Sequence, residues 1–162
     1  NYLAQKMDLP FDKNGHLAKK GKLNNDLILK LNQLSFFNLS FPKSLSLEDF
    51  NSWYLPVVSN CDCSIFDQLF TTGYHLANSI KNILGENRKL LVTGGGAYNQ
   101  FWIQKLKELN IAVIIPESFL VEFKEALIFS LLGVLKIRDE VNCLSSITGA
   151  VKDLKSGIIH TP

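Results

Sequence analysis

The stretch LLVTGGGAYN, residues 90–99, decides the fold of this chain. Residues 89–93 form a compact run rich in leucine and β-branched side chains, which is typical of a buried strand, and three glycines end it. A helical pattern resumes over residues 99–109, and the strand pattern returns over residues 111–115. A strand, a glycine turn, a helix and a second strand in succession predict a right-handed parallel crossover. We therefore expect an α/β fold with parallel strands near 89–93 and 111–115.

Helical patterns cover much of the remaining sequence, so we expect a helix-rich fold. Residues 27–34 carry leucines at the spacing of one buried helical face. Residues 64–84 are the longest periodic stretch, and Gly85 lies where that helix should stop. Residues 122–136 predict a strongly apolar helix that packs on the sheet. In the tail, residues 147–150 predict a turn, and a short apolar run after them predicts either a strand or an ordered loop.

The composition is that of one ordinary globular domain. The chain has 162 residues, of which 46% are hydrophobic and 20% are charged, so it can bury a substantial core. Its 17 basic and 15 acidic residues are spread along the chain, and no basic patch indicates nucleic-acid binding. No apolar run reaches the roughly 18 residues that a membrane-spanning helix needs. We expect a protein that binds neither nucleic acid nor membrane.

The cysteines and histidines predict neither a disulfide framework nor a metal site. Cys61 and Cys63 flank a single residue, and Cys143 stands alone, so we expect reduced cysteines and a cytoplasmic location. The three histidines are far apart in the sequence, and none lies at a spacing typical of zinc ligands.

The glycine triplet is the most informative candidate for ligand binding. Ligands of open α/β sheets bind at the carboxyl ends of the strands, and Gly94, Gly95 and Gly96 leave that end without any Cβ atom. The position suits a nucleotide, which could approach backbone N–H groups and a helix start. Asn99 stands where a dinucleotide fingerprint needs its last glycine, and no Gly-Lys-Ser/Thr follows, so the Rossmann and P-loop families are disfavoured. Alternatively, the triplet serves only to turn the strand tightly into the helix.

Three further side chains are candidates, each with a purely structural alternative. Asn99 is placed to hydrogen-bond a ribose or base edge, or to cap the helix that begins there. Glu125 interrupts the apolar helix, so its carboxylate needs a partner, a ligand or an exposed edge. Lys43 follows Pro42 in a stiff loop, where it could hold a phosphate or carboxylate, or simply be solvated. No Ser/His/Asp or Cys/His set is present. The residues alone therefore predict half of a nucleotide site without catalytic groups.

Several motifs in the same order and spacing resemble a known family. Residues 90–99 resemble the adenosine-side motif of the sugar kinase, actin and Hsp70 superfamily. The whole chain resembles the anhydro-N-acetylmuramic acid kinase family. The matching residues are Asp12, Gly15, Ala18 and Gly21, Pro42-Lys43-Ser44 with Glu48 and Phe50, Glu125-Ala126-Leu127 with Phe129, and residues 146–150.

The resemblance implies an RNase H-like (actin-like ATPase) fold. Residues 1–162 would then be the C-terminal, nucleotide-side domain of a two-domain kinase whose N-terminal domain and first strands precede Asn1. It also implies ATP and Mg²⁺ as cofactors, with the magnesium ligands outside this chain. The family opens the 1,6-anhydro ring of anhydro-N-acetylmuramic acid and phosphorylates O6 in peptidoglycan recycling.

The resemblance assigns no catalytic residue to this chain, because the base and the phosphate loop are expected upstream of Asn1. It implies adenosine binding at Gly94, Gly95, Gly96 and Asn99, and substrate binding at Glu125 and Lys43. The sequence departs from the family at residues 45–47, where many relatives carry Thr-Gly-Arg. The resemblance therefore specifies the acceptor sugar less well than it specifies the use of a nucleotide.

Two alternatives to this kinase remain open: a non-catalytic interaction module, and a kinase of another sugar on the same fold. We also expect the missing strands to leave a sheet edge and apolar surface exposed, which favours a homodimer.

Overall fold

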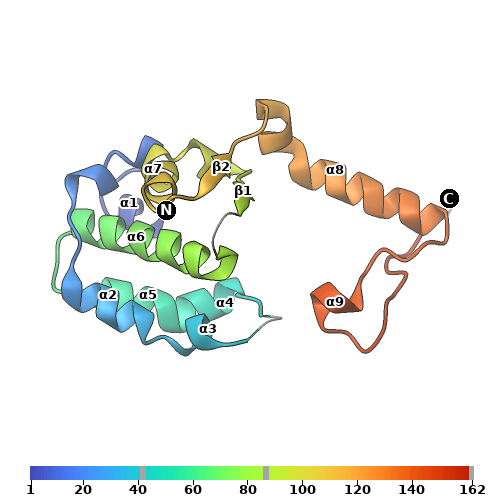
Figure 1. Ribbon diagram of the computed structural model, residues 1–162, viewed down its shortest axis with the longest axis horizontal. Coiled ribbons are helices and arrows are strands. Elements are labelled where there is room, and N and C mark those ends of the chain that lie inside the picture. Colours follow the sequence, from blue (N-terminus) through green and yellow to red (C-terminus); the bar gives the residue numbers. More distant parts are fainter. Residues whose placement is uncertain (41–42, 86–87, 161–162) are drawn as a thin grey trace.

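The computed structural model describes residues 1–40, 43–85 and 88–160, so Pro42 lies outside the described residues. A helical body formed by α1 to α7 packs beside a small sheet, and α8 extends away from both (Figure 1). The α-helices are α1 (Tyr2–Gln5), α2 (Asn25–Asn32), α3 (Ser35–Asn38), α4 (Leu47–Asp49), α5 (Leu55–Ser59), α6 (Ile65–Leu84), α7 (Gln100–Glu108), α8 (Ser118–Ile137) and α9 (Ser145–Thr148). The strands are β1 (Lys89–Leu91) and β2 (Ala112–Ile114). Helical turns of other types are the 3₁₀ turns η1 (Lys13–Gly15), η2 (Ala18–Lys20) and η4 (Gly95–Tyr98) and the π-helical turn η3 (Phe50–Tyr54).

The sheet confirms the predicted parallel pair. β1 and β2 run parallel, with Lys89 opposite Ala112 and Leu91 opposite Ile114, and α7 lies between them in the chain. Both strands are shorter than predicted, although the Val92 N–H still donates to the Ile114 carbonyl at 2.9 Å. The chain then turns at Gly94, so the strand ends where the glycine triplet begins.

Helix α6 is the central element of the helical body, and its bounds match the predicted helix. It begins at the N-cap Ser64, whose hydroxyl accepts a hydrogen bond from the Asp67 N–H at 3.1 Å, and it ends at Gly85, which has a φ of 68°. α6 packs against α2, α7 and η2 (Figure 1). At Gly73, α6 meets α7 so closely that a Cβ atom would lie 2.6 Å from the Phe101 ring.

Two buried clusters meet along α6. Buried residues of the first are Leu3, Leu27, Leu31 and Val58, with Ile65 and Leu69 of α6 packed against them. Buried residues of the second are Ala77, Leu106 and Ile111, with Ile80, Leu90 and Val113 packed against them. The second cluster covers one face of the sheet. Leu91 and Ile114 alternate with the covered residues and are 56% and 43% exposed, so the other face of the sheet is open.

The Asp12, Gly15, Ala18 and Gly21 pattern has a structural explanation. The Asp12 carboxylate accepts hydrogen bonds from the Leu17 and Ala18 N–H groups at 2.8 and 3.0 Å. A Cβ atom on Gly15 would lie 2.6 Å from the Asn99 side-chain oxygen, and one on Gly21 would collide with the Phe66 carbonyl. The pattern therefore folds a loop tightly against α6 and the start of α7.

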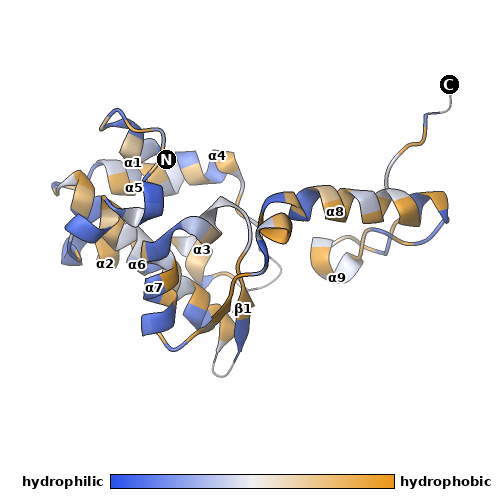
Figure 2. Cartoon of the chain, turned by 90° about the horizontal axis from the view of Figure 1, so that it is seen from above, coloured by the Kyte–Doolittle hydropathy of each residue, from blue (hydrophilic) through white to orange (hydrophobic). Residues whose placement is uncertain are grey.

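Helix α8 does not pack on the sheet, and that prediction is wrong. Within the described ranges, Val121 is the one buried residue of α8, whereas Phe119, Phe129 and Ile137 are at least two-thirds exposed. Figure 2 shows α8 apart from the helical body, with hydrophobic residues along much of its length. A helix that is apolar on every side does not select one face for packing, and two short strands offer it little surface. None of the helices in the described part of the chain is long and apolar enough to cross a membrane.

The prediction of three reduced cysteines is wrong for two of them. Cys61 and Cys63 form a disulfide in the turn between α5 and α6, and Cys143 is free. The bend at this turn brings the two Cα atoms to 5.4 Å, a normal separation for bonded cysteines.

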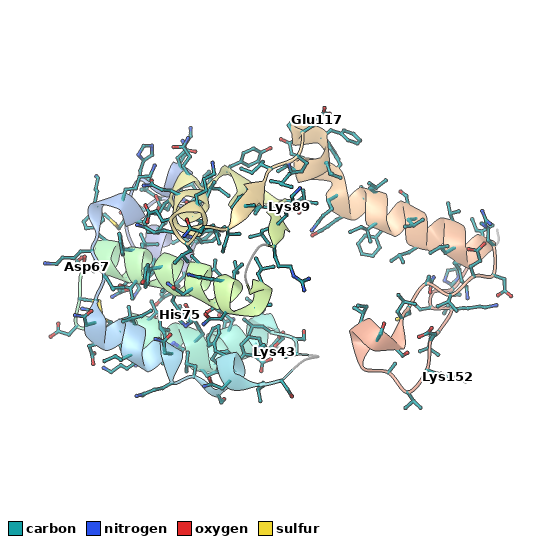
Figure 3. The ribbon with its side chains drawn as sticks, in the orientation of Figure 1. Lys43, Asp67, His75, Lys89, Glu117 and Lys152 are labelled. Atoms are coloured by element: carbon teal, nitrogen blue, oxygen red, sulfur yellow. A yellow bond between two sulfur atoms is a disulfide. The ribbon has the colours of Figure 1, made fainter. Side chains whose placement is uncertain are left out.

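His75 lies buried in an aromatic cluster between α6 and the α3–α5 region (Figure 3). Its Nδ1 lies 3.3 Å from the Tyr54 hydroxyl, and its ring meets the Phe37 ring edge-on with centroids 4.5 Å apart. Burial disfavours the imidazolium and lowers the pKa of His75 from 6.5 to about 4. Burial also raises the pKa of Tyr54, so both groups are neutral near pH 7.

We predict that acid destabilises the fold through His75. Because the folded pKa is below the unfolded value, the unfolded state binds the proton first as the pH falls. The stabilisation is complete above about pH 6.5 and is lost as the pH falls towards about 4. Urea unfolding at pH 7 and pH 5 should show a loss on the order of 1–2 kcal/mol from this residue. His75→Gln should flatten that pH dependence, whereas His16→Gln, at an exposed position, should leave it unchanged. An equal slope in His75→Gln and the unmodified chain would contradict the prediction.

Candidate functional site

Gly94 is glycine for a backbone reason. Its φ of 70° and ψ of −175° belong to a region that only glycine adopts readily. Its N–H donates to the Val121 carbonyl at 3.0 Å, which ties the turn after β1 to the first part of α8. A side chain at this position would strain the turn whatever lay around it.

Gly95 has neither a backbone nor a packing reason to be glycine. It is exposed, its φ is not in the left-handed region, and a Cβ atom there would have no neighbour within 4 Å among the described residues. At Gly96 a Cβ atom would make only ordinary contact, 3.5 Å from the Trp102 ring. Because Gly95 has no side chain and is exposed, another molecule can approach its backbone directly.

Asn99 caps α7, as one of the two alternatives predicted. Its side-chain oxygen accepts hydrogen bonds from the Phe101 and Trp102 N–H groups at 3.1 and 3.3 Å. Its amide NH₂ makes no hydrogen bond within the described ranges, so a donor remains beside the glycine triplet. Capping and ligand binding are therefore compatible, because they use different atoms of one side chain.

Sequence reasoning missed one pair at this site. The Tyr98 hydroxyl donates to the Glu122 carboxylate at 3.0 Å, which joins η4 to α8 beside the bond between Gly94 and Val121. Desolvation and, to a smaller extent, the hydrogen bond that the hydroxyl donates to Glu122 raise the pKa of Tyr98. The only sequence signal was a tyrosine inside the glycine turn, and its partner lies 24 residues away.

Glu125 lies one helical turn beyond Val121 and Glu122, the residues of α8 that bond to Gly94 and Tyr98. It follows Glu122 by three residues and Val121 by four, so all three belong to one side of the helix. Glu125 is exposed, which agrees with the exposed-edge alternative for its carboxylate. The structure thus brings Glu125 to the same end of α8 as the glycine turn.

Lys43 is not brought to the glycine turn. Its ammonium donates to the Phe36 and Phe37 carbonyls at 3.0 and 3.3 Å and lies 5.0 Å from the centroid of the Phe36 ring. Figure 3 shows Lys43 on the α3–α4 side of the body, well separated from Glu117 at the start of α8. In residues 1–40, 43–85 and 88–160, no group of three acidic, histidine or cysteine residues is placed to hold a metal ion.

The whole chain, residues 1–162, matches a family model described as anhydro-N-acetylmuramic acid kinase. The chain belongs to this family. Three curated relatives named anhydro-N-acetylmuramic acid kinase illustrate the match. The protein of Vibrio parahaemolyticus is 31% identical over 161 residues, which is 93% of this chain and 44% of that protein. The protein of Legionella pneumophila strain Lens is 34% identical over 86% of this chain and 40% of its own length. The protein of Shewanella frigidimarina is 36% identical over 67% of this chain and 30% of its own length.

The family match confirms the predicted resemblance and sets its extent. The chain spans less than half the length of the three curated relatives named above.

We predict that Asn99 has a stability role that can be separated from any binding role. Asn99→Ala should lower the free energy of unfolding by about 1 kcal/mol, because two N–H groups of α7 lose their acceptor. Asn99→Asp should keep the cap and the stability, because a carboxylate oxygen accepts the same bonds. Urea unfolding of both variants tests this. An equal loss of unfolding free energy in the two variants would show that the helix cap is not how Asn99 stabilises the fold.

Proposed function

We propose that the chain is the adenosine-side part of an ATP-dependent sugar kinase with an RNase H-like fold. The kinase would open the 1,6-anhydro ring of anhydro-N-acetylmuramic acid and phosphorylate O6, in cytoplasmic peptidoglycan recycling. The family match supports the reaction class, and Gly95 is the observation that supports the nucleotide site. Nothing inside the described residues requires glycine there, so an approaching ligand is the simplest reason for it.

The geometry suits the adenosine half of the nucleotide. The open backbone of Gly95 and Gly96 would accept a flat group, and the free amide of Asn99 would donate to a ribose or base acceptor. Phosphoryl transfer also needs a base for the attacking hydroxyl, a loop around the phosphates and carboxylates that hold Mg²⁺. We assign these groups, including the magnesium ligands, to the part of the kinase that precedes Asn1. The isolated chain is then expected to be inactive.

The sugar-binding position is proposed at Glu125, with Lys43 as a second contact. Glu125 is exposed and lies one turn from the Gly94–Val121 contact, so a sugar held near it would be close to the nucleotide. A ligand contact at Lys43 would require its ammonium to leave the Phe36 and Phe37 carbonyls, or its loop to move. Residues 45–47, which depart from the Thr-Gly-Arg of many relatives, lie just after Lys43. Because this departure lies beside a proposed sugar contact, the alternative form of the proposal is a kinase that phosphorylates a different sugar.

A non-catalytic interaction module is a second candidate, and the exposed surface of α8 favours it. Large apolar side chains cover α8, and the open face of the sheet adds Leu91 and Ile114. Many large exposed apolar side chains on one helix favour an interaction site. In the kinase proposal the same surface is covered by the N-terminal domain, or by a second copy when that domain is absent.

We predict that Gly95→Val in the full-length protein raises the KM for ATP at least tenfold in a coupled ADP-release assay with anhydro-N-acetylmuramic acid. The valine side chain would occupy the space through which the nucleotide reaches the backbone. The fold should tolerate the substitution, because a Cβ atom at Gly95 meets no described residue within 4 Å. A thermal melt of the variant checks this point.

The matched control for this assay is Glu125→Gln, which should raise the KM for the sugar and leave that for ATP unchanged. Turnover with a different sugar would keep the nucleotide site and remove the proposed substrate. No turnover with any sugar would favour the interaction module, and an unchanged KM for ATP in Gly95→Val would place the nucleotide elsewhere.

We predict that the isolated chain self-associates through α8. Sedimentation velocity at increasing concentration should show dimers or larger species. Leu127→Glu, at a residue 56% exposed on α8, should shift the distribution towards monomer. Leu29→Glu, at a residue 61% exposed on α2, should leave the distribution unchanged. A clean monomer at high concentration would count against this prediction.

A further inference from the structure

The turn between α5 and α6 holds an unusual pair of cysteines. Cys61 and Cys63 are bonded across the single residue Asp62, and their Cα atoms lie 5.4 Å apart. Both cysteines are half-buried and pack against the first core cluster, which contains Leu27 and Val58. The pair is therefore part of the packed body, at the point where the central helix begins.

This disulfide is poorly suited to stapling the fold. A cross-link stabilises chiefly by restricting the unfolded chain, and the restriction shrinks with the length of the loop that is closed. Here the loop contains one residue between the cysteines, and the chain already joins α5 to α6 within a few residues. A role other than mechanical reinforcement is the better explanation for two cysteines at this place.

Gln68 indicates which state of the pair the surrounding structure favours. Its side chain is 95% buried, since its exposed fraction is 5%, and its amide nitrogen donates to the Cys63 carbonyl at 3.2 Å. Its amide oxygen has no hydrogen-bond partner within the described ranges. A buried acceptor without a donor is costly. Reduction of the disulfide would create a thiol donor on Cys63, the residue whose carbonyl already accepts from this amide. A hydrogen bond from that thiol would give the amide oxygen the partner that it lacks in the oxidised pair.

We propose that Cys61 and Cys63 form a reversible dithiol–disulfide pair that exchanges with glutathione. One cysteine thiolate attacks glutathione disulfide, forms a mixed disulfide and releases one glutathione. The second cysteine thiolate attacks the mixed disulfide, forms the Cys61–Cys63 bond and releases the second glutathione. Two electrons pass from the dithiol to glutathione disulfide, and the two thiol protons end on the two released glutathiones.

In this proposal Gln68 is a positioning residue, which would tune the equilibrium by accepting a hydrogen bond from the Cys63 thiol in the reduced state. The pair is also coupled to α6, because Ser64, the N-cap of that helix, follows Cys63 directly. This proposal is independent of the kinase function.

The test equilibrates the full-length protein in glutathione buffers of increasing disulfide content, followed by acid quenching, alkylation and tryptic mass spectrometry. Residues 44–81 form one tryptic peptide that contains both cysteines, and Cys143 falls in a separate peptide, 139–152. The 44–81 peptide should lose both free thiols together and regain them when the buffer is returned to a reducing ratio. Cys61→Ser and Cys63→Ser should each abolish the intramolecular bond, whereas Cys143→Ser should not affect it.

Gln68→Met supplies the readout that a merely structural cysteine pair would not give. It removes the acceptor for the thiol, so it should shift the equilibrium towards the disulfide by about two- to tenfold. Gln33→Met, at an exposed position, should give no shift. The proposal is overturned if the bond never forms, if it persists at every ratio, or if only mixed glutathione adducts appear. An unchanged equilibrium in Gln68→Met overturns the role assigned to Gln68.

Discussion

The close approach of α7 to α6 at Gly73 is the contact on which the rest of the structure depends. Phe101 is 2% exposed and lies against Gly73 on one side and Gly15 on the other. Asn99, two residues before Phe101, caps α7 and ends the glycine turn. The packing of Phe101 therefore fixes the positions of both α7 and the glycine turn. β1 and β2 flank α7 in the chain, and the second core cluster then covers one face of their sheet.

The sequence predicted the parts of this arrangement that depend on local chemistry. The parallel strands, the bounds of α6 and the cap at Asn99 all follow from residue types within a few positions of one another. The packing of α8 was not predictable, because its apolar residues surround the helix and define no single face. The pairs Tyr98–Glu122 and Lys43–Phe36 depend on how distant or irregular segments meet, and no periodic signal encodes that. The Cys61–Cys63 bond depends on the bend of one short turn.

Two kinds of surface distinguish the site from the remainder of the molecule. The glycine turn is open and polar at its backbone, and the amide NH₂ of its capping asparagine makes no hydrogen bond to any described residue. α8 and the open face of the sheet instead expose large apolar side chains. The curated relatives of Vibrio parahaemolyticus and Legionella pneumophila are more than twice as long as this chain.

Helix α8 is attached to the preceding chain near its N-terminal end. Within the described residues, two hydrogen bonds join it to the preceding chain, Gly94 to Val121 and Tyr98 to Glu122, and both lie in its first two turns. A helix of 20 residues is about 30 Å long, so a tilt of about 10° at this pivot would carry its far end through about 5 Å. Because both hydrogen bonds lie near one end of α8, a small rotation at the glycine turn becomes a displacement of several ångströms at the far end of the helix.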